Sequence, residues 1–334
     1  DEPTSYLTEH ESENLFGLIR LLKQNGHTVI YISHKLDEVF AIADRVSVLR
    51  DGKLISTKTI EDTTKDETIS FMVGRSISNM YPTRETTVGE TLFRVKDLCK
   101  ENVFSNITFQ LKRGEILGFY GLVGSGRTEI AQAILGILDI DLGEIYVNDE
   151  RVKIKSPQDA LQYKIGYLSE DRKNYSTLST MNVKENISIS NLEEYSNFSF
   201  INKSQEEKAA ERFVERLEIR TPTIFENIVN LSGGNQQKVF FSRILSLNPQ
   251  IMILDEPTQG IDVGAKVEIY NLINDLVDTG IGIILISSEL PEILSISDRI
   301  IVMCKGRITG MFESAKANQE LLLKAADRKS TRLN

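Results

Sequence analysis

In the run Ile251-Met-Ile-Leu-Asp-Glu-Pro-Thr258, a series of apolar residues ends abruptly in two adjacent carboxylates. Continuous apolar runs of this kind are typical of a strand buried on both faces of a parallel sheet. Such a strand would deliver Asp255 and Glu256 to one edge of the sheet. Carboxylates in that position commonly hold a metal ion.

A glycine-rich loop lies upstream, at Gly121-Leu-Val-Gly-Ser-Gly-Arg-Thr128. Its spacing is that of a phosphate-binding P-loop, with Arg127 where lysine is expected. The preceding 115–120 read as a strand and about 127–138 as a helix, which is the context that the motif requires. Glycines let successive backbone N–H groups converge on an anion, although a glycine turn on its own is also consistent with simple chain reversal.

The first four residues, Asp1-Glu-Pro-Thr4, repeat those at 255–258. At that constant offset, 18 of the 53 residues in 1–53 are identical to their counterparts in 255–307. Chance gives about one identity in twenty, so the register indicates a duplicated domain. The phosphate loop of the first copy would lie before Asp1, and we therefore expect the chain to be an N-terminally truncated fragment.

A third motif, Leu231-Ser-Gly-Gly-Asn-Gln-Gln-Lys238, lies between the loop and the acidic strand. Together with the turn Gly260-Ile-Asp262 and His34, the motifs resemble those of the ATP-binding subunits of ABC transporters, over nearly the whole chain. Further features are similar to bacterial monosaccharide importers of the ribose and galactose type: two fused copies, Arg127 in the second loop, Ser169-Glu-Asp-Arg-Lys173 and Gly260-Ile-Asp-Val-Gly-Ala-Lys266.

Alternating strand and helix patterns predict an α/β fold with a mostly parallel core sheet. The resemblance implies a P-loop NTPase of the ABC ATPase type, with an antiparallel β subdomain and a helical signature subdomain. In the first copy we expect a strand at 28–33. The expected domains are the end of the first ABC ATPase domain (1–55), a polar interdomain linker (56–90), the second ABC ATPase domain (91–326, helical subdomain about 171–247) and a disordered tail (327–334).

The resemblance also implies roles for individual residues. Glu256, and Glu2 in the first copy, would be the carboxylates that activate water, and His34 would contact the γ-phosphate. Mg²⁺ would be held by Thr128 and Asp255, and in the first copy by Asp1. The residues expected at the nucleotide are Gly121, Gly124, Ser125, Gly126, Arg127, Thr128, Glu129 and Glu170, and the signature residues Ser232, Gly233 and Gly234 would contact the nucleotide of the other copy. Read alone, Ser232 could be an ordinary helix cap and His34 a polar strand end.

The second copy departs from the family pattern at three positions. Ser288 aligns with His34 but is too short for the same contact and carries no positive charge. Glu170 stands where glutamine is usual, and Arg127 replaces lysine. These changes put ATP turnover at this site in doubt, but not binding.

Composition limits the function classes. The formal charge of −9 provides no global basic field for nucleic acid, and the two cysteines are too few for a disulfide framework. Apolar runs such as 281–286 are far shorter than the roughly 20 residues that span a bilayer. The segment near Val103 or Phe104 has two interpretations. It could form an aromatic platform for the base of the nucleotide, or Phe104 could occupy a core position.

The resemblance therefore implies an ATP- and Mg²⁺-dependent subunit at the cytoplasmic face of the cell membrane. It would power monosaccharide import through a separate multi-spanning permease in the inner membrane, served by a periplasmic or lipid-anchored sugar-binding protein, with no nucleic acid partner. The alternative is a soluble tandem ABC ATPase that acts on ribosomes or DNA. The segment 56–90 lacks the length and heptads of the linkers in such proteins. A catalytically dead repeat is disfavoured by Glu2, His34, Asp255 and Glu256.

Overall fold

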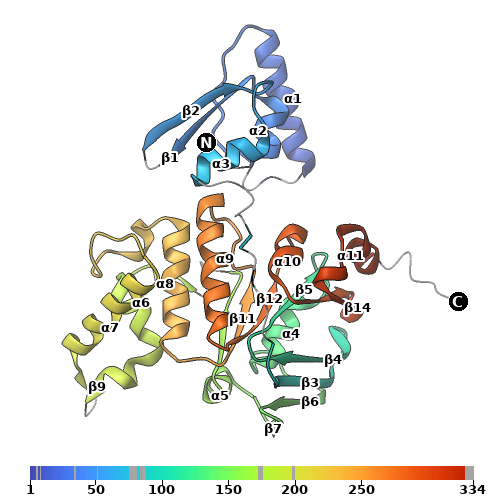
Figure 1. Ribbon diagram of the computed structural model, residues 1–334, viewed down its shortest axis with the longest axis vertical. Coiled ribbons are helices and arrows are strands. Elements are labelled where there is room, and N and C mark those ends of the chain that lie inside the picture. Colours follow the sequence, from blue (N-terminus) through green and yellow to red (C-terminus); the bar gives the residue numbers. More distant parts are fainter. Residues whose placement is uncertain are drawn as a thin grey trace, which may run out of the picture. The chain divides into compact units, whose positions relative to one another are not determined.

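The computed structural model describes the chain except residues 5, 6, 8, 34, 51, 75–80, 83, 85–87, 172–175, 198, 199 and 328–334. The chain divides into two compact units, Asp1–Met80 with Asp262–Val267 and Tyr81–Ile261 with Glu268–Asn334. Figure 1 colours the chain from blue at its N-terminus to red at its C-terminus. Within the described ranges, no helix is both long and apolar enough to cross a membrane.

A six-stranded sheet with the order β14-β13-β5-β12-β11-β8 forms the centre of the second unit. All neighbouring strands in it are parallel except β13 and β14. Three central strands are buried along their whole length, which explains their continuous apolar sequences. The strands are β5 (Ile116–Gly121), β8 (Ile165–Leu168), β11 (Ile251–Asp255), β12 (Gly282–Ile286), β13 (Arg299–Cys304) and β14 (Arg307–Glu313). The predicted α/β fold with a mostly parallel core sheet is confirmed.

The order of these strands positions the site. β12 pairs with β5 on one side and with β11 on the other, all parallel. The loop after β5 and the carboxylates at the end of β11 therefore open at the same edge of the sheet, where parallel α/β sheets bind their ligands.

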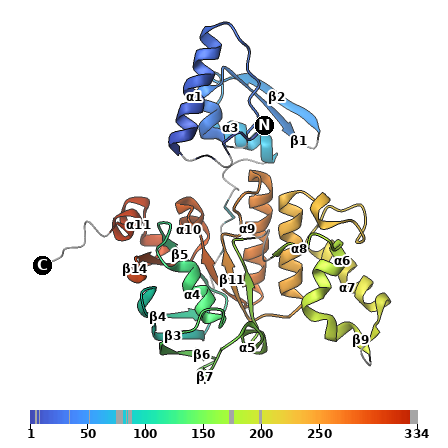
Figure 2. The same cartoon turned by 180° about the vertical axis from the view of Figure 1, so that it is seen from behind.

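Helices accompany the parallel sheet, and Figure 2 shows them from the opposite side. The helix α4 (Arg127–Ile134) follows the loop after β5, whereas α10 (Leu290–Ile296) and α11 (Gln319–Ala326) contact β5. Two further helices, α5 (Pro157–Gln162) and α9 (Val263–Asp278), precede β8 and β12, respectively, and a short 3-10 turn, η5 (Ser314–Lys316), follows β14.

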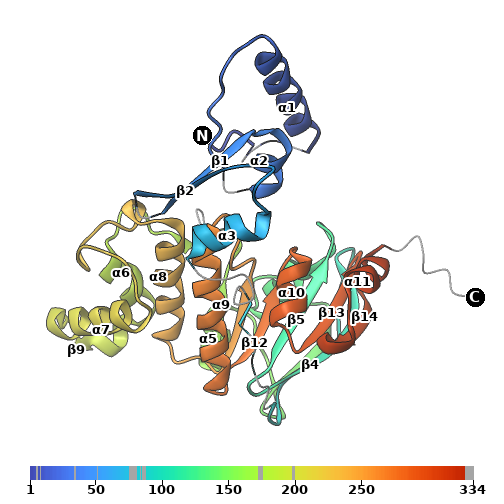
Figure 3. The same ribbon diagram turned by 45° about the horizontal axis from the view of Figure 1, so that its top comes forward.

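A second, antiparallel sheet has the order β4-β3-β6-β7. Phe109 joins it to the parallel sheet by an edge-on contact with Phe119 of β5, with ring centroids 5.1 Å apart. β4 also contacts β14, as Figure 3 shows. Phe104 is 3% exposed within this core, which supports the core interpretation of that residue. The strands are β3 (Thr91–Lys100), β4 (Phe104–Lys112), β6 (Leu142–Val147) and β7 (Glu150–Val152).

A helical region carries the Leu-Ser-Gly-Gly motif. In it α6 (Val183–Ser188) contacts both α7 (Lys203–Arg216) and α8 (Gly233–Leu245). The buried ion pair between Lys184 Nζ and Glu206 Oε2, 2.7 Å long, joins α6 to α7. Shorter elements complete the region: η3 (Ile189–Tyr195), η4 (Ile228–Asn230), and the strand pair β9 (Ser196–Asn197) and β10 (Phe200–Ile201).

The first unit contains three helices and a two-stranded antiparallel sheet in its described part. β2 continues to Thr59 and α3 follows it. Residues 56–59 and 65–73 are therefore folded, although the sequence predicts an interdomain linker over 56–90. The elements are α1 (Glu9–Gln24), α2 (Leu36–Ile42), β1 (Arg45–Arg50), β2 (Lys53–Thr59) and α3 (Lys65–Val73).

The strand expected at 28–33 is not formed, so that prediction was wrong. Ile30 and Ile32 are 87% and 55% exposed. Their counterparts in the second copy lie in β12, which receives hydrogen bonds from β5 and β11. No strand in the described part of the first unit runs beside 28–33, so the backbone groups of this segment lack the partners that make a strand.

The duplication is visible in the structure at the same constant offset. Paired elements begin at equivalent residues: α1 with α9, α2 with α10, β1 with β13, β2 with β14, and α3 with α11. A bulge lies at Val48/Leu49 in one copy and at Val302/Met303 in the other. Each copy of the Asp-Glu-Pro-Thr segment is therefore followed by these paired helices and strands in the same order.

Candidate functional site

The glycine-rich loop connects β5 to α4. Gly124 and Gly126 have φ angles of +74° and +100°, in the left-handed region that favours glycine. A Cβ atom on Gly121 would lie 2.5 Å from the carbonyl oxygen of Met303, so a side chain is excluded there. The strand, glycine turn and helix N-terminus needed for an anion-binding loop are thus all present.

Arg127 occupies the lysine position of the loop and is 8% exposed. Its Nη1 donates to the carbonyl oxygens of Gly121 and, at 3.1 Å, Ser287. Its Nη2 lies 3.8 Å from Oε1 of Glu256. The guanidinium therefore bridges the ends of β5 and β12 and stands beside the carboxylate predicted to be catalytic.

Asp255 is fully buried at the end of β11. Its Oδ2 accepts a hydrogen bond from the Tyr167 hydroxyl at 3.2 Å. Burial raises the pKa of Asp255 to about 6, opposed chiefly by a hydrogen bond with Thr128. Thr128 and Asp255, the two predicted metal ligands of this copy, are therefore brought together.

Two buried oxygen atoms at this site, Oδ1 of Asp255 and Oγ of Ser125, have no hydrogen-bond partner among the described residues. Leaving a buried polar atom unsatisfied is costly, so such atoms are suited to bind a ligand. Carboxylate and hydroxyl oxygens are the donors that Mg²⁺ prefers, and the donor set therefore fits this ion.

Glu256 follows Asp255 and is 9% exposed. Its φ of +48° is unusual for a residue with a side chain, and its N–H donates to the carbonyl of Ile286 at 2.9 Å. Burial raises the pKa of Glu256 to about 7, opposed by the charge of Arg127 and by a hydrogen bond with Ser288. Ser288, which aligns with His34, thus contacts the predicted catalytic carboxylate directly.

Glu170 and Glu129 lie around the same edge. Oε1 of Glu170 accepts a hydrogen bond from the side-chain amide of Gln259 at 3.3 Å. The negative charge of Glu170 also raises the pKa of Asp255. Glu129 lies in the first turn of α4. Of the run 169–173, the last two residues lie outside the described part of the chain.

The Leu-Ser-Gly-Gly motif lies at the start of α8. Ser232 is the N-cap residue, and its side chain makes no capping hydrogen bond. Its exposed hydroxyl instead accepts from the side-chain amide of Asn235 at 2.9 Å. Gly233 and Gly234 form the first turn, and a Cβ on Gly233 would touch Ile261 at 3.4 Å. Ser232 therefore presents its hydroxyl near a helix N-terminus.

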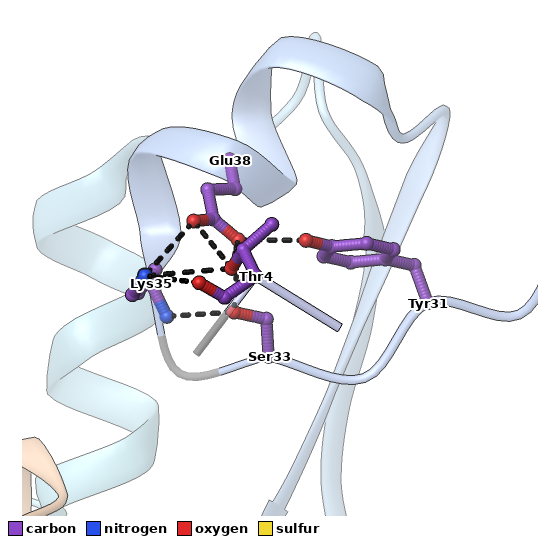
Figure 4. Close-up of polar contacts among 5 residues, drawn as sticks. All are labelled: Thr4, Tyr31, Ser33, Lys35 and Glu38. Carbon is purple, nitrogen blue, oxygen red and sulfur yellow. Dashed lines mark hydrogen bonds and ion pairs between the residues drawn. The ribbon is translucent and has the colours of Figure 1, made fainter. Parts of the chain in front are cut away.

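The predicted site residues of the first copy are only partly described. Asp1 is exposed, and Glu2 has a φ of +45° and donates its N–H to Ile32 O at 2.7 Å, matching Glu256. His34 lies outside the described residues. Figure 4 shows the polar cluster nearby, in which the Glu38 carboxylate accepts from the hydroxyls of Thr4 and Tyr31 at 2.7 and 2.6 Å.

Several residues at the second site were not predicted from the sequence. Tyr167 reaches Asp255 because β8 pairs with β11, and no pattern in the sequence specifies that pairing. Gln259 and the contact between Ser288 and Glu256 likewise depend on the order of the strands. The repeat register identifies Ser288 as a substitution for histidine, but not as a hydrogen-bond partner of Glu256.

Comparison with known proteins places these features in a family. Residues 104–259 match the family model described as ABC transporter. The chain is 50% identical to the xylose import ATP-binding protein XylG of Thermoanaerobacter pseudethanolicus, covering 98% of this chain and 66% of that protein. It is 47% identical to the ribose import ATP-binding protein RbsA of Clostridium tetani, covering 98% and 65%. The chain thus spans about two thirds of the length of these relatives.

Solved structures show the same fold. An ATP-binding cassette of an ABC transporter in its ADP conformation has a TM-score of 0.61 at 23% identity, covering 72% of this chain and 97% of that one. A nucleotide-free cassette has a TM-score of 0.60 at 23% identity, covering 73% and 98%. At this level of identity the likeness concerns the fold alone.

Proposed function

Since this chain belongs to the ABC transporter family, we propose that its second unit binds ATP with Mg²⁺ and that the full-length parent hydrolyses ATP to power the import of a monosaccharide. The observation that carries the nucleotide site is the meeting of the glycine-rich loop, Thr128 and Asp255 at one sheet edge, with unsatisfied oxygens on Ser125 and Asp255.

The loop would bind the phosphates. Its backbone N–H groups and the N-terminus of α4 supply partial positive charge, and Arg127 adds a full charge within the same site. Thr128 and Asp255 would hold Mg²⁺, which when bound neutralises charge on the phosphate oxygens. Glu170 would add a second carboxylate beside Asp255.

Glu256 would orient or deprotonate the attacking water. Its pKa of about 7 suits a general base near neutral pH. Two groups already engage this carboxylate, namely Arg127 at 3.8 Å and the Ser288 hydroxyl. We infer that a site with serine at the histidine position turns over slowly while it still binds nucleotide.

The signature would act across the two copies. Ser232, Gly233 and Gly234 would complete the nucleotide site of the first copy, where Asp1 would hold the metal, Glu2 would be the base and His34 would contact the γ-phosphate. Both glutamates share the same strained backbone and the same backbone hydrogen bond, which supports equivalent roles.

Sugar import is proposed from the names of the relatives, which are import ATP-binding proteins for xylose, ribose and galactose. The parent would sit at the cytoplasmic face of the membrane, bound to a multi-spanning permease that receives sugar from a binding protein. Pull-down of the detergent-solubilised parent should recover such a permease. Recovery of ribosomes or DNA that resists moderate salt would favour a soluble tandem ATPase instead.

Equilibrium binding of a fluorescent ATP analogue tests the nucleotide site. Gly126→Asp places a carboxylate and a strained side chain in the loop, and Arg127→Ala removes its charge, so both variants should bind much more weakly. Lys316→Ala, which removes a surface charge paired with Glu313, serves as the control and should bind normally. Unchanged affinity in both loop variants would refute the site.

A further inference from the structure

The segment just before the second unit's first strand is fastened to α9. The ring of Tyr81 stacks on the ring of Tyr270, with centroids 5.3 Å apart and planes 28° from parallel. One helical turn further along, the side-chain amide of Asn274 donates to the carbonyl oxygen of Pro82 at 3.1 Å. Asn274 is 8% exposed, so this contact is buried.

Arg84 provides a second anchor. Its Nη2 pairs with Oδ2 of Asp298, and the two side chains are 9% and 14% exposed. The same Asp298 oxygen accepts a hydrogen bond from the backbone N–H of Ile116 at 2.8 Å. Ile116 begins β5, the strand that leads into the phosphate loop. A buried ion pair of this kind is strongly destabilising to break, so the segment is held firmly at this end.

The first anchor lies beside the loop that follows the acidic strand. Thr258, two residues after Glu256, donates its hydroxyl to Oε1 of the fully buried Glu292 at 2.8 Å. Burial raises the pKa of Tyr270, and the charge of Glu292 raises it further. The pKa of Tyr81 is raised to about 12. Burial is the largest cause, and the charges of Glu289 and Glu292 raise this pKa further. The charge of the carboxylate that fixes Thr258 therefore acts on both rings.

The first copy holds the equivalent glutamate differently, as Figure 4 shows. There Glu38 accepts from the Tyr31 hydroxyl at 2.6 Å and pairs with Lys35 at 3.3 Å, in addition to its bond with Thr4. In the second copy, the positions of Tyr31 and Lys35 are taken by Leu285 and Glu289. Leucine offers no donor, and a second carboxylate adds negative charge.

We propose that Tyr81, Pro82 and Arg84 form a strap that positions the loop 255–258 of the second copy, taking over a support that Tyr31 and Lys35 provide within the first copy. The strap residues are positioning residues for the metal side of the nucleotide site. The proposal rests on the proposed nucleotide site. It gives the end of the segment between the two copies a role in nucleotide binding.

A positioning role of the strap can be distinguished from a general contribution to the stability of the fold. The phosphate loop follows β5, whereas the strap's tyrosine stacks on Tyr270, which interacts with Thr258 in the loop after β11. Loss of the Tyr81 ring should therefore reduce the gain in nucleotide affinity that comes from Mg²⁺, which Asp255 would hold. Metal-free binding of the nucleotide by the phosphate loop should be unchanged. A loss of general stability would weaken both alike.

The test compares the affinity of a fluorescent ATP analogue with excess Mg²⁺ and with EDTA, for the wild-type chain, Tyr81→Ala and Tyr81→Phe. With Mg²⁺, Tyr81→Ala should bind about two- to thirtyfold more weakly, the range typical of residues that act through others. With EDTA it should match the wild type. Tyr81→Phe keeps the stacked ring and should restore the affinity with Mg²⁺.

Tyr146→Ala is the matched control, because Tyr146 also makes an aromatic contact, with Arg94 at 4.5 Å, but on the antiparallel sheet. It should bind like the wild type in both conditions. If Tyr81→Ala fails to fold, Asn274→Ala, which removes the hydrogen bond to Pro82 in the same anchor, tests the strap with the same expected pattern. Equal affinities for wild type and Tyr81→Ala with Mg²⁺, or equal losses in both conditions, would overturn the strap. Absence of binding by the wild type would instead refute the nucleotide site.

Discussion

At the scale of single residues, the second site is defined by two buried carboxyl groups with raised pKa values, about 6 for Asp255 and about 7 for Glu256. Burial is the main cause for both. Neither the charge of Arg127 nor the neighbouring hydroxyls fully offset it. Such perturbed carboxyls are common at sites that bind a cation or move a proton.

These pKa values predict how stability depends on pH. Unfolded carboxyls ionise at about pH 4, whereas Glu256 in the folded chain retains its proton up to about pH 7. The folded state binds more protons in this window, so Glu256 makes the chain less stable as pH rises from about 4 to 7. Glu256→Gln removes this dependence. Relative to wild type, the variant should gain about 3 kcal/mol between pH 4 and pH 8.

Urea unfolding of both proteins at the two pH values measures this gain. Glu313→Gln is the control, because Glu313 is exposed and its pKa is lowered by Lys316. It should show no such gain. If the difference between Glu256→Gln and wild type were the same at pH 4 and pH 8, Glu256 would not be the group that titrates.

At the scale of elements, identical sequence patterns have different outcomes in the two copies. Residues 282–286 form a central buried strand, whereas 28–33 form none, although both are rich in isoleucine. A pattern of apolar residues predicts a strand only where neighbouring strands are available to pair with it. The absence of such neighbours could have been inferred from the position of the phosphate loop in the repeat, but the local pattern could not reveal it.

Ile30 and Ile284 are equivalent in the repeat and provide a matched test. Ile284 is 2% exposed and Ile30 is 87% exposed. Ile284→Ala should therefore lower the free energy of unfolding by about 2–5 kcal/mol, whereas Ile30→Ala should change it by less than about 0.5 kcal/mol. Chemical denaturation of the two variants checks this. Similar losses would mean that 28–33 is buried in solution.

Most elements of the second copy could be predicted from the sequence, because strand–helix alternation and the glycine-rich loop have strong local signals. The strand Ile251–Asp255 and the helix beginning at Arg127 are examples. Contacts that depend on strand order could not be predicted. Tyr167 reaches Asp255, and Tyr81 reaches Tyr270, only because of pairings between distant segments.

At the scale of the whole molecule, we propose two nucleotide sites of different composition, one for each copy of the repeat. One would combine Glu2 and His34 with the signature at Ser232. The other would combine Arg127, Asp255 and Glu256 with the signature of the first copy, and it has Ser288 in place of histidine. The difference predicts unequal turnover in the full-length parent.

Steady-state ATP hydrolysis by a protein that carries both complete copies, at saturating ATP, measures this inequality. Glu2→Gln should remove nearly all turnover, since loss of a positioned general base typically costs ~10²–10⁴-fold. Glu256→Gln should leave a measurable fraction. If the two substitutions were equally damaging while nucleotide still bound, the asymmetry would be refuted and Ser288 would be a tolerated residue in a working site.

We propose that the carboxyl ends of β5 and β11 hold a nucleotide and its metal together. The most direct measurement is the affinity of this chain for ATP with and without Mg²⁺, in the wild type and in Asp255→Asn. Mg²⁺ should tighten binding to the wild type but not to Asp255→Asn, and the two proteins should bind alike in EDTA. An Asp255→Asn variant that kept the full gain from Mg²⁺ would contradict the claim.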